Sequence, residues 1–107
     1  MSKRQPQLLI DDIIESGSRI LLYTNDLTFD TFIKDNKTID AVIRNFEIIG
    51  EAANRLPEDF KEKNTQIDWY RIIGFRNRIV HDYMGIDYSI VWEIKNSFLP
   101  TLLENLK

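Results

Sequence analysis

The spacing of the apolar residues is the feature that most constrains the fold of this chain. Apolar side chains recur at intervals of three and four residues, the period of an amphipathic helix, and strand-like alternation is absent. The 107 residues include four glycines and three prolines, so few positions interrupt a helical pattern. The sequence predicts one all-α domain over residues 1–107, in which four substantial helices joined by short connections form an antiparallel bundle.

Caps and breakers place the ends of these helices. We expect a helix over about 5–23, a short extra helix within 27–34, a long helix from near 36–38 to about 56, a helix that begins after 68 and stops around 83–84, and a last helix that Asp87 or Ser89 caps and that ends at Leu106. Thr28 and Asp68 are expected as N-caps, and Gly85 as a C-terminal glycine. Pro100 should kink the last helix near Ser97.

Composition and charge limit the classes of function. The net charge of −3 argues against a protein that coats nucleic acid without specificity, yet three arginines and no acid lie between Arg71 and His81. Such a basic patch suits one phosphate or a short strand rather than long duplex. The absence of cysteine and the single histidine exclude the usual zinc-binding sets, and we expect no cofactor. With no apolar run near the roughly 20 residues of a membrane span and no signal peptide, we expect a cytoplasmic protein.

The most distinctive stretch is Gly74-Phe75-Arg76-Asn77-Arg78-Ile79-Val80-His81-Asp82-Tyr83, near the end of a predicted helix. His81 is the only histidine of the chain, and an imidazole can take or give a proton near neutral pH. Arginine supplies a permanently charged planar fork that suits phosphate oxygens. Phosphodiester chemistry is therefore the first hypothesis for this helix.

A helical wheel separates the two charged groups of this stretch. Arg76 falls inside the apolar arc, so we expect it either to be buried with a partner, for which Glu47 and Glu51 of the long helix are candidates, or to meet a second surface. His81 falls about 140° from Arg76 and on the same side as Asn77, which could hydrogen-bond its ring. Within an ideal helix, Arg76 and His81 would therefore not converge well on one phosphate.

Two arrangements would bring these groups together: the helix unwinds near His81, or a two-fold dimer pairs two such helices. Cleavage of RNA through its 2′-hydroxyl benefits from one group that takes a proton and another that gives one. One chain offers one histidine and two chains offer two, and symmetric dimers are the commonest oligomers. We therefore expect a homodimer with the site in the cleft.

Simpler interpretations remain open for several residues of this region. His81 could be a helix C-terminal histidine that interacts with the macrodipole. Arg78 is expected on a solvated face, and Tyr83 could be a core residue or a phosphate contact. Tyr70 and Trp92 are ambiguous between a structural role and base stacking.

The motif Arg76, four residues, His81, one residue, Tyr83 resembles the Arg-x4-His-x-Tyr motif of the HepT-like toxins, a family within the HEPN superfamily of helical ribonucleases. The run 44–53 resembles the long helix of that family, and the run 90–94 resembles its last helix. From the long helix onward, the resemblance covers nearly the whole chain.

This resemblance implies a HEPN-like bundle that dimerises and places two Arg-His pairs in a shared cleft. Members of the family are described as metal-independent endoribonucleases that cut RNA by attack of a 2′-hydroxyl. The resemblance assigns stabilisation of the phosphorane charge to Arg76, proton transfer to His81 and support of the site to Asn77. Glu47 and Glu51 are expected to contact these residues without touching the RNA themselves.

The resemblance also implies a type VII toxin–antitoxin pair. The cognate antitoxin is typically a minimal nucleotidyltransferase, which inactivates the toxin by attaching AMP to the motif tyrosine, here Tyr83. A bulky anionic group beside Arg76 and His81 would keep RNA out of the site. The alternative is a non-catalytic module of the same fold that binds a nucleotide or RNA, or that docks the nucleotidyltransferase.

Overall fold

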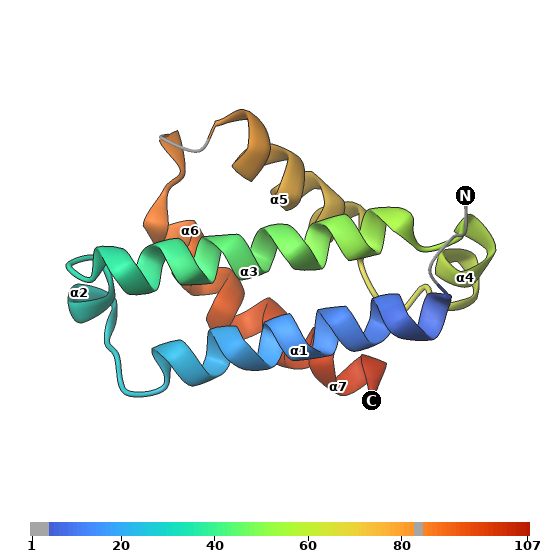
Figure 1. Ribbon diagram of the computed structural model, residues 1–107, viewed down its shortest axis with the longest axis horizontal. Coiled ribbons are helices and arrows are strands. Elements are labelled where there is room, and N and C mark those ends of the chain that lie inside the picture. The colour runs from blue at the N-terminus through green and yellow to red at the C-terminus, as the bar shows by residue number, and fades with distance from the viewer. Residues whose placement is uncertain (1–4, 83–84) are drawn as a thin grey trace.

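The computed structural model describes residues 5–82 and 85–107, and every regular element in these ranges is helical (Figure 1). The elements in chain order are α1 (Pro6–Thr24), α2 (Phe29–Phe32), α3 (Asn36–Arg55), α4 (Glu58–Lys63), α5 (Trp69–His81), α6 (Tyr88–Glu93), the π-helical turn η2 (Ile94–Phe98) and α7 (Leu99–Leu106). The predicted all-α fold is confirmed. No described helix is both long enough and apolar enough to cross a membrane.

The bundle is organised around α3, which contacts α1 on one side and α5 on another. Figure 1 shows α1 and α3 running side by side in opposite directions, with α6, η2 and α7 crossing behind them and α5 beside α3 on the side opposite to α1. Apolar side chains from these helices form one core, among them Leu9, Ile13, Ile20, Val42, Phe46, Ala53, Ile72, Ile79, Val91 and Leu99. The stripes that the sequence shows at helical spacing are the faces buried here.

The short polar side chains that precede several helices act as N-caps, as the sequence predicts. The hydroxyl of Thr28 accepts a hydrogen bond from the N–H of Thr31 at 3.2 Å, in a capping box that starts α2. Asp68 accepts from the N–H of Arg71 at 3.0 Å, and Asp87 caps α6. Each cap supplies an acceptor for a backbone N–H that has no partner inside its own helix.

The end of α5 differs from the prediction. The helix stops at His81 rather than at 83–84, because Asp82 leaves the helical region with φ −144° and ψ 49°. Gly85 is not a left-handed C-terminal glycine, since none of the described residues has a positive φ. A side chain at Gly85 would instead overlap the carboxylate of Asp82. After the end of the helix, the N–H of Gly85 donates to the carbonyl of Asp82 at 3.1 Å.

The last helix is distorted where the sequence places its proline, but as a π-helical turn rather than a simple kink. The turn spans Ile94–Phe98 and includes Ser97. The N–H of Leu99 donates to the carbonyl of Ile94, five residues earlier. Proline at position 100 has no N–H to continue the ordinary hydrogen-bond ladder, and the change of hydrogen-bond pattern occurs just before it.

Candidate functional site

The site begins with a close crossing of α3 and α5 at Gly50. A Cβ atom built on Gly50 would overlap the Cβ of Arg76 and come within 2.7 Å of its Cγ. Nearby, the rings of Phe46 and Phe75 meet edge to face with centroids 5.3 Å apart. The absence of a side chain at Gly50 therefore lets the stem of Arg76 lie directly on the backbone of α3.

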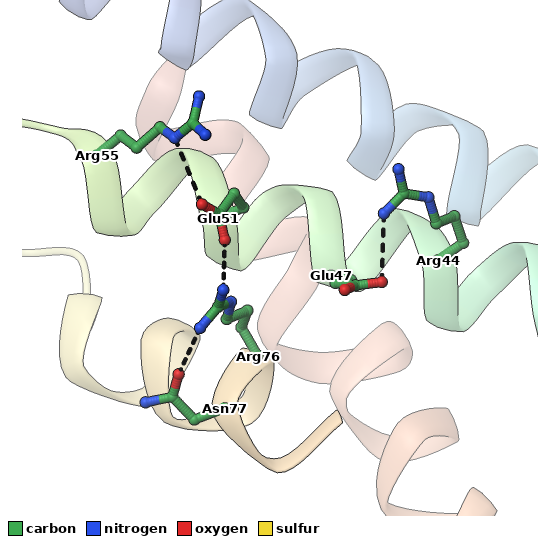
Figure 2. A network of polar contacts seen from close by, with 6 residues as sticks. All are labelled: Arg44, Glu47, Glu51, Arg55, Arg76 and Asn77. Atoms are coloured by element: carbon green, nitrogen blue, oxygen red, sulfur yellow. Dashed lines mark hydrogen bonds and ion pairs between the residues drawn. The ribbon is translucent and has the colours of Figure 1, made fainter. Parts of the chain in front are cut away.

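Arg76 is held at this crossing by two polar partners (Figure 2). Its Nη2 lies 2.6 Å from Oε2 of Glu51 on α3, and its Nη1 donates to Oδ1 of Asn77 at 2.9 Å. The side chain is 26% exposed, and Nε is buried with no hydrogen-bond partner. A guanidinium has five N–H groups, so one N–H on each Nη remains for a ligand. Arginine N–H groups of this kind are well suited to the oxygens of a phosphate.

Glu51 bridges two arginines. Its Oε1 lies 3.4 Å from Nε of Arg55, one turn further along α3, while its Oε2 binds Arg76. Figure 2 shows Arg55 and Arg76 approaching the carboxylate from opposite sides. The prediction that a carboxylate of the long helix pairs with Arg76 is thus confirmed for Glu51. Glu47 does not take this role, because its Oε1 pairs with Arg44 at 3.2 Å.

His81 is exposed at the last position of α5. Among the described residues it makes no hydrogen bond with Asn77, whose side-chain oxygen accepts from Arg76 instead. The helix stays α-helical through His81, so it does not unwind to bring the imidazole round to Arg76. Of the two arrangements that the sequence allows, the structure of a single chain excludes unwinding before His81. Tyr83, the third residue of the motif, lies outside the described residues.

A groove lies between α5 and α6, on the side of α5 away from Arg76. It has a volume of about 410 Å³ and is lined by Arg71, Gly74, Phe75, Arg78, Ile86, Asp87, Ile90 and Ile94. Its floor is mostly apolar, and Ile90 is 48% exposed. Asp87 also lines the groove, where hydrogen bonds from Ser89 lower the pKa of its carboxyl. Within residues 5–82 and 85–107, no cluster of three or more potential metal ligands occurs.

Sequence reasoning missed two residues of the site, Gly50 and Arg55. Arg55 follows Glu51 by four residues, and that spacing places two side chains on one helix face, so this ion pair was open to prediction. Gly50 carried only the general signal of a glycine inside an otherwise regular helix. Its partner was not visible, because nothing in the sequence fixes where α5 crosses α3.

The fold and the site define a class: a small helical bundle that presents an arginine and a histidine from one helix. The family model for ribonuclease HepT-like proteins matches residues 13–107, and the chain belongs to this HepT-like family. This confirms the family resemblance of the Arg-x4-His-x-Tyr motif.

Curated relatives align over nearly the whole chain. "Putative RNase MJ0127" of Methanocaldococcus jannaschii is 41% identical over 107 residues, covering 100% of this chain and 88% of its own length. "Probable ribonuclease HepT" of Thermococcus cleftensis is 36% identical, covering 94% of this chain and 91% of its own length. "Putative RNase TTE0752" of Caldanaerobacter subterraneus is 32% identical, covering 97% and 93%. No solved structure matches the chain significantly.

Proposed function

We propose that this chain is a metal-independent endoribonuclease that works as a homodimer. The observation that carries the proposal is the state of Arg76: a partly buried guanidinium, fixed by Glu51 and Asn77, with two N–H groups left for a ligand. A fixed cation of this kind is suited to an anionic transition state, because it needs no reorganisation when charge develops. Membership of a ribonuclease family supports RNA as the substrate.

The proposed reaction is an internal displacement at phosphorus. One imidazole takes the proton of the 2′-hydroxyl while the O2′–P bond forms. A second imidazole gives a proton to the 5′-oxygen as the P–O5′ bond breaks, which leaves a 2′,3′-cyclic phosphate and a 5′-hydroxyl. Arg76 stabilises the negative charge of the phosphorane between these steps. His81 supplies the imidazole in each chain, and Asn77 holds the guanidinium.

A dimer supports this chemistry because one chain offers one histidine, which lies on a different side of α5 from Arg76. The groove between α5 and α6 is not the cleft of this dimer, because it lies on the side of α5 away from Arg76 and is lined by neither Arg76 nor His81. The pairing has to bring Arg76 of one chain toward His81 of the other.

The proposal extends to regulation and location. The chain would be the toxin of a cytoplasmic toxin–antitoxin pair, silenced when a minimal nucleotidyltransferase attaches AMP to Tyr83. Tyr83 follows His81 by two residues, so an added phosphate would carry negative charge to the place where the RNA phosphate binds. Mass spectrometry of the chain made together with its partner enzyme, compared with Tyr83→Phe, tests this part. An unmodified Tyr83 in a neutralised toxin contradicts it.

The central test is cleavage of RNA by the purified chain in the presence of EDTA. Arg76→Ala and His81→Ala should each abolish cleavage, while Arg19→Ala should cleave like the wild type. Arg19 is a matched control because it is an exposed arginine of α1, paired with Glu15 at 2.6 Å. Cleavage by both site variants would refute the mechanism. RNA binding without cleavage by the wild type would favour the alternative, a non-catalytic binding module.

A further inference from the structure

The face of α5 turned away from α3 carries a line of residues that leads to His81. Tyr70, Gly74, Asn77 and His81 follow one another at spacings of four, three and four, which places them within about 60° of one another around the helix. All four are exposed. We call these four residues the outer face of α5.

Tyr70 is exceptional on this face because its side chain is 90% exposed, the highest value among the large hydrophobic and aromatic side chains of the described residues. Its hydroxyl has no hydrogen-bond partner in that part of the chain. Trp92, the other aromatic residue that the sequence left ambiguous, has a structural position: its ring lies 5.0 Å from that of Phe32 and 3.6 Å from the ammonium of Lys95. Burial of Tyr70 thus contributes almost nothing to the stability of the single chain.

We propose that the outer face of α5 binds a single-stranded segment of the RNA substrate and that one base stacks on Tyr70. This inference rests on the proposed ribonuclease function and adds a second contact to it. Eleven residues of α-helix span roughly 16 Å. At the roughly 3.4 Å rise of stacked nucleotides, the stacked base lies at most about five nucleotides from the scissile linkage.

The charge along this helix fits an anionic strand. No acidic residue occurs from Trp69 to His81, although the chain as a whole has a net charge of −3. Arg78 is exposed and forms no ion pair with any described residue, so it is available to a phosphate. Arg71 is engaged differently, 3.8 Å from a carboxylate oxygen of Asp68 and 5.8 Å from the ring centre of Phe98.

The outer face of α5 is distinct from the apolar groove between α5 and α6. The two surfaces share Gly74, but Tyr70 does not line the groove. Gly74 lies between Tyr70 and His81, and a Cβ built there has no atom within 4 Å. A sugar–phosphate strand can therefore approach the helix along this line. Any base can stack on an exposed aromatic ring, so this contact suits a nuclease that acts on single strands.

The first experiment measures binding of a labelled single-stranded oligoribonucleotide to the His81→Ala background by fluorescence anisotropy, so that the RNA stays intact. Adding Tyr70→Ala should weaken binding about tenfold, within the range for loss of one base–aromatic stack. Tyr70→Phe should bind like the parent because it keeps the ring. Tyr23→Ala is the matched control, since Tyr23 is 40% exposed on α1, and it should have no effect. Equal affinity of the Tyr70→Ala and Tyr23→Ala chains overturns the inference.

A second measurement distinguishes stacking from a structural effect. An abasic nucleotide is moved along the oligonucleotide one position at a time. With Tyr70 present, one position should lower affinity about tenfold, and with Tyr70→Ala that position should no longer differ from its neighbours. An abasic profile that Tyr70→Ala leaves unchanged overturns the inference, as does a change of oligomeric mass in Tyr70→Ala, which would assign the ring to a protein contact.

The two proposals fail separately. If the wild type binds RNA without cutting it, the proposed ribonuclease function fails while the abasic profile still tests Tyr70. If the wild type cuts RNA and Tyr70→Ala binds and cuts equally well, only the role of Tyr70 fails.

Discussion

The two sides of α3 differ in what they bury. Toward α1 the contact is apolar, with side chains such as Ile20 of α1 and Val42 of α3 fully buried. Toward α5 the contact also includes apolar side chains, such as Phe46 and Phe75. It differs in the close crossing at Gly50, beside which Glu51 and Arg76 form a partly exposed ion pair. One helix therefore serves both as a wall of the core and as the support of a charged site.

This difference separates stability from chemistry. Apolar burial contributes free energy in proportion to the area removed from water, so the fully buried side chains between α1 and α3 contribute strongly to stability. The ion pair on the α5 side is partly solvated, and pairs of this kind contribute little to the free energy of unfolding. We therefore expect substitutions toward α1 to change stability, and substitutions of charged residues toward α5 to change activity.

The largest effect on the free energy of unfolding is expected for Ile20→Ala. Ile20 is completely buried on α1, and removing a buried isoleucine side chain costs about 2–5 kcal/mol. Urea unfolding should show this loss. The cleavage rate per folded molecule, measured where the variant remains folded, should be unchanged. A normal free energy of unfolding with reduced cleavage would show that the two sides of α3 are not separable.

The next effect is expected for Gly50→Ala, which adds one methyl group at the crossing. The new Cβ would overlap the Cβ of Arg76 and lie 3.3 Å from its Cα, so α5 must shift as a body. Overpacking of this kind costs about 1–3 kcal/mol, and here the shift also moves the guanidinium away from Glu51. Both the free energy of unfolding and the rate of RNA cleavage should therefore decrease.

Gly17→Ala is the control for this crossing. Its Cβ would meet the end of the flexible Leu103 side chain, with Cδ2 at 2.7 Å, rather than a backbone. Cleavage should therefore survive. Equal loss of cleavage in the two glycine variants would show that close packing at Gly50 has no special role in the site.

The sequence predicted one side of α3 more completely than the other. Apolar spacing identified the helices and their buried faces, because that pattern is local and repeats within each helix. Asp68 and Thr28 were identified as caps for the same reason: a cap acts within a few residues of its own position. The end of α5 was misplaced by about two residues because Gly85 matches a C-cap signal, although none of the described residues has the positive φ that this signal implies.

The site depends on relations between helices, which local patterns do not contain. The wheel placed Arg76 in the apolar arc and required a partner, but it left Glu47 and Glu51 equally possible, since they lie one turn apart on α3. Only the position where α5 crosses α3 decides for Glu51. The relative position of His81 and Arg76 in the proposed site is harder still to predict from the sequence, because it depends on how two chains would pair.

A smaller effect is expected for Glu51→Gln. The amide keeps the shape and one acceptor but loses the charge that fixes Arg76 and that Arg55 shares. We expect kcat to fall about tenfold, equivalent to ~1.4 kcal/mol, with a change below about 1 kcal/mol in the free energy of unfolding.

Glu47→Gln is the matched control for Glu51→Gln, since Glu47 is a carboxylate one turn earlier on α3 that pairs with Arg44. It should leave kcat unchanged. Equal losses in kcat for the two variants would mean that the net charge of α3, rather than the contact with Arg76, governs the rate.

The smallest effect is expected for Gly74→Ala, which should increase the free energy of unfolding rather than decrease it. In the single chain a Cβ at Gly74 meets nothing within 4 Å, and alanine is favoured over glycine inside a helix by about 1 kcal/mol. Thermal unfolding of the dilute chain without RNA should shift upward by a few degrees. The same substitution is thus expected to stabilise at Gly74 and to destabilise at Gly50. A loss of stability at Gly74 that grows with protein concentration would instead show that another chain packs against this glycine.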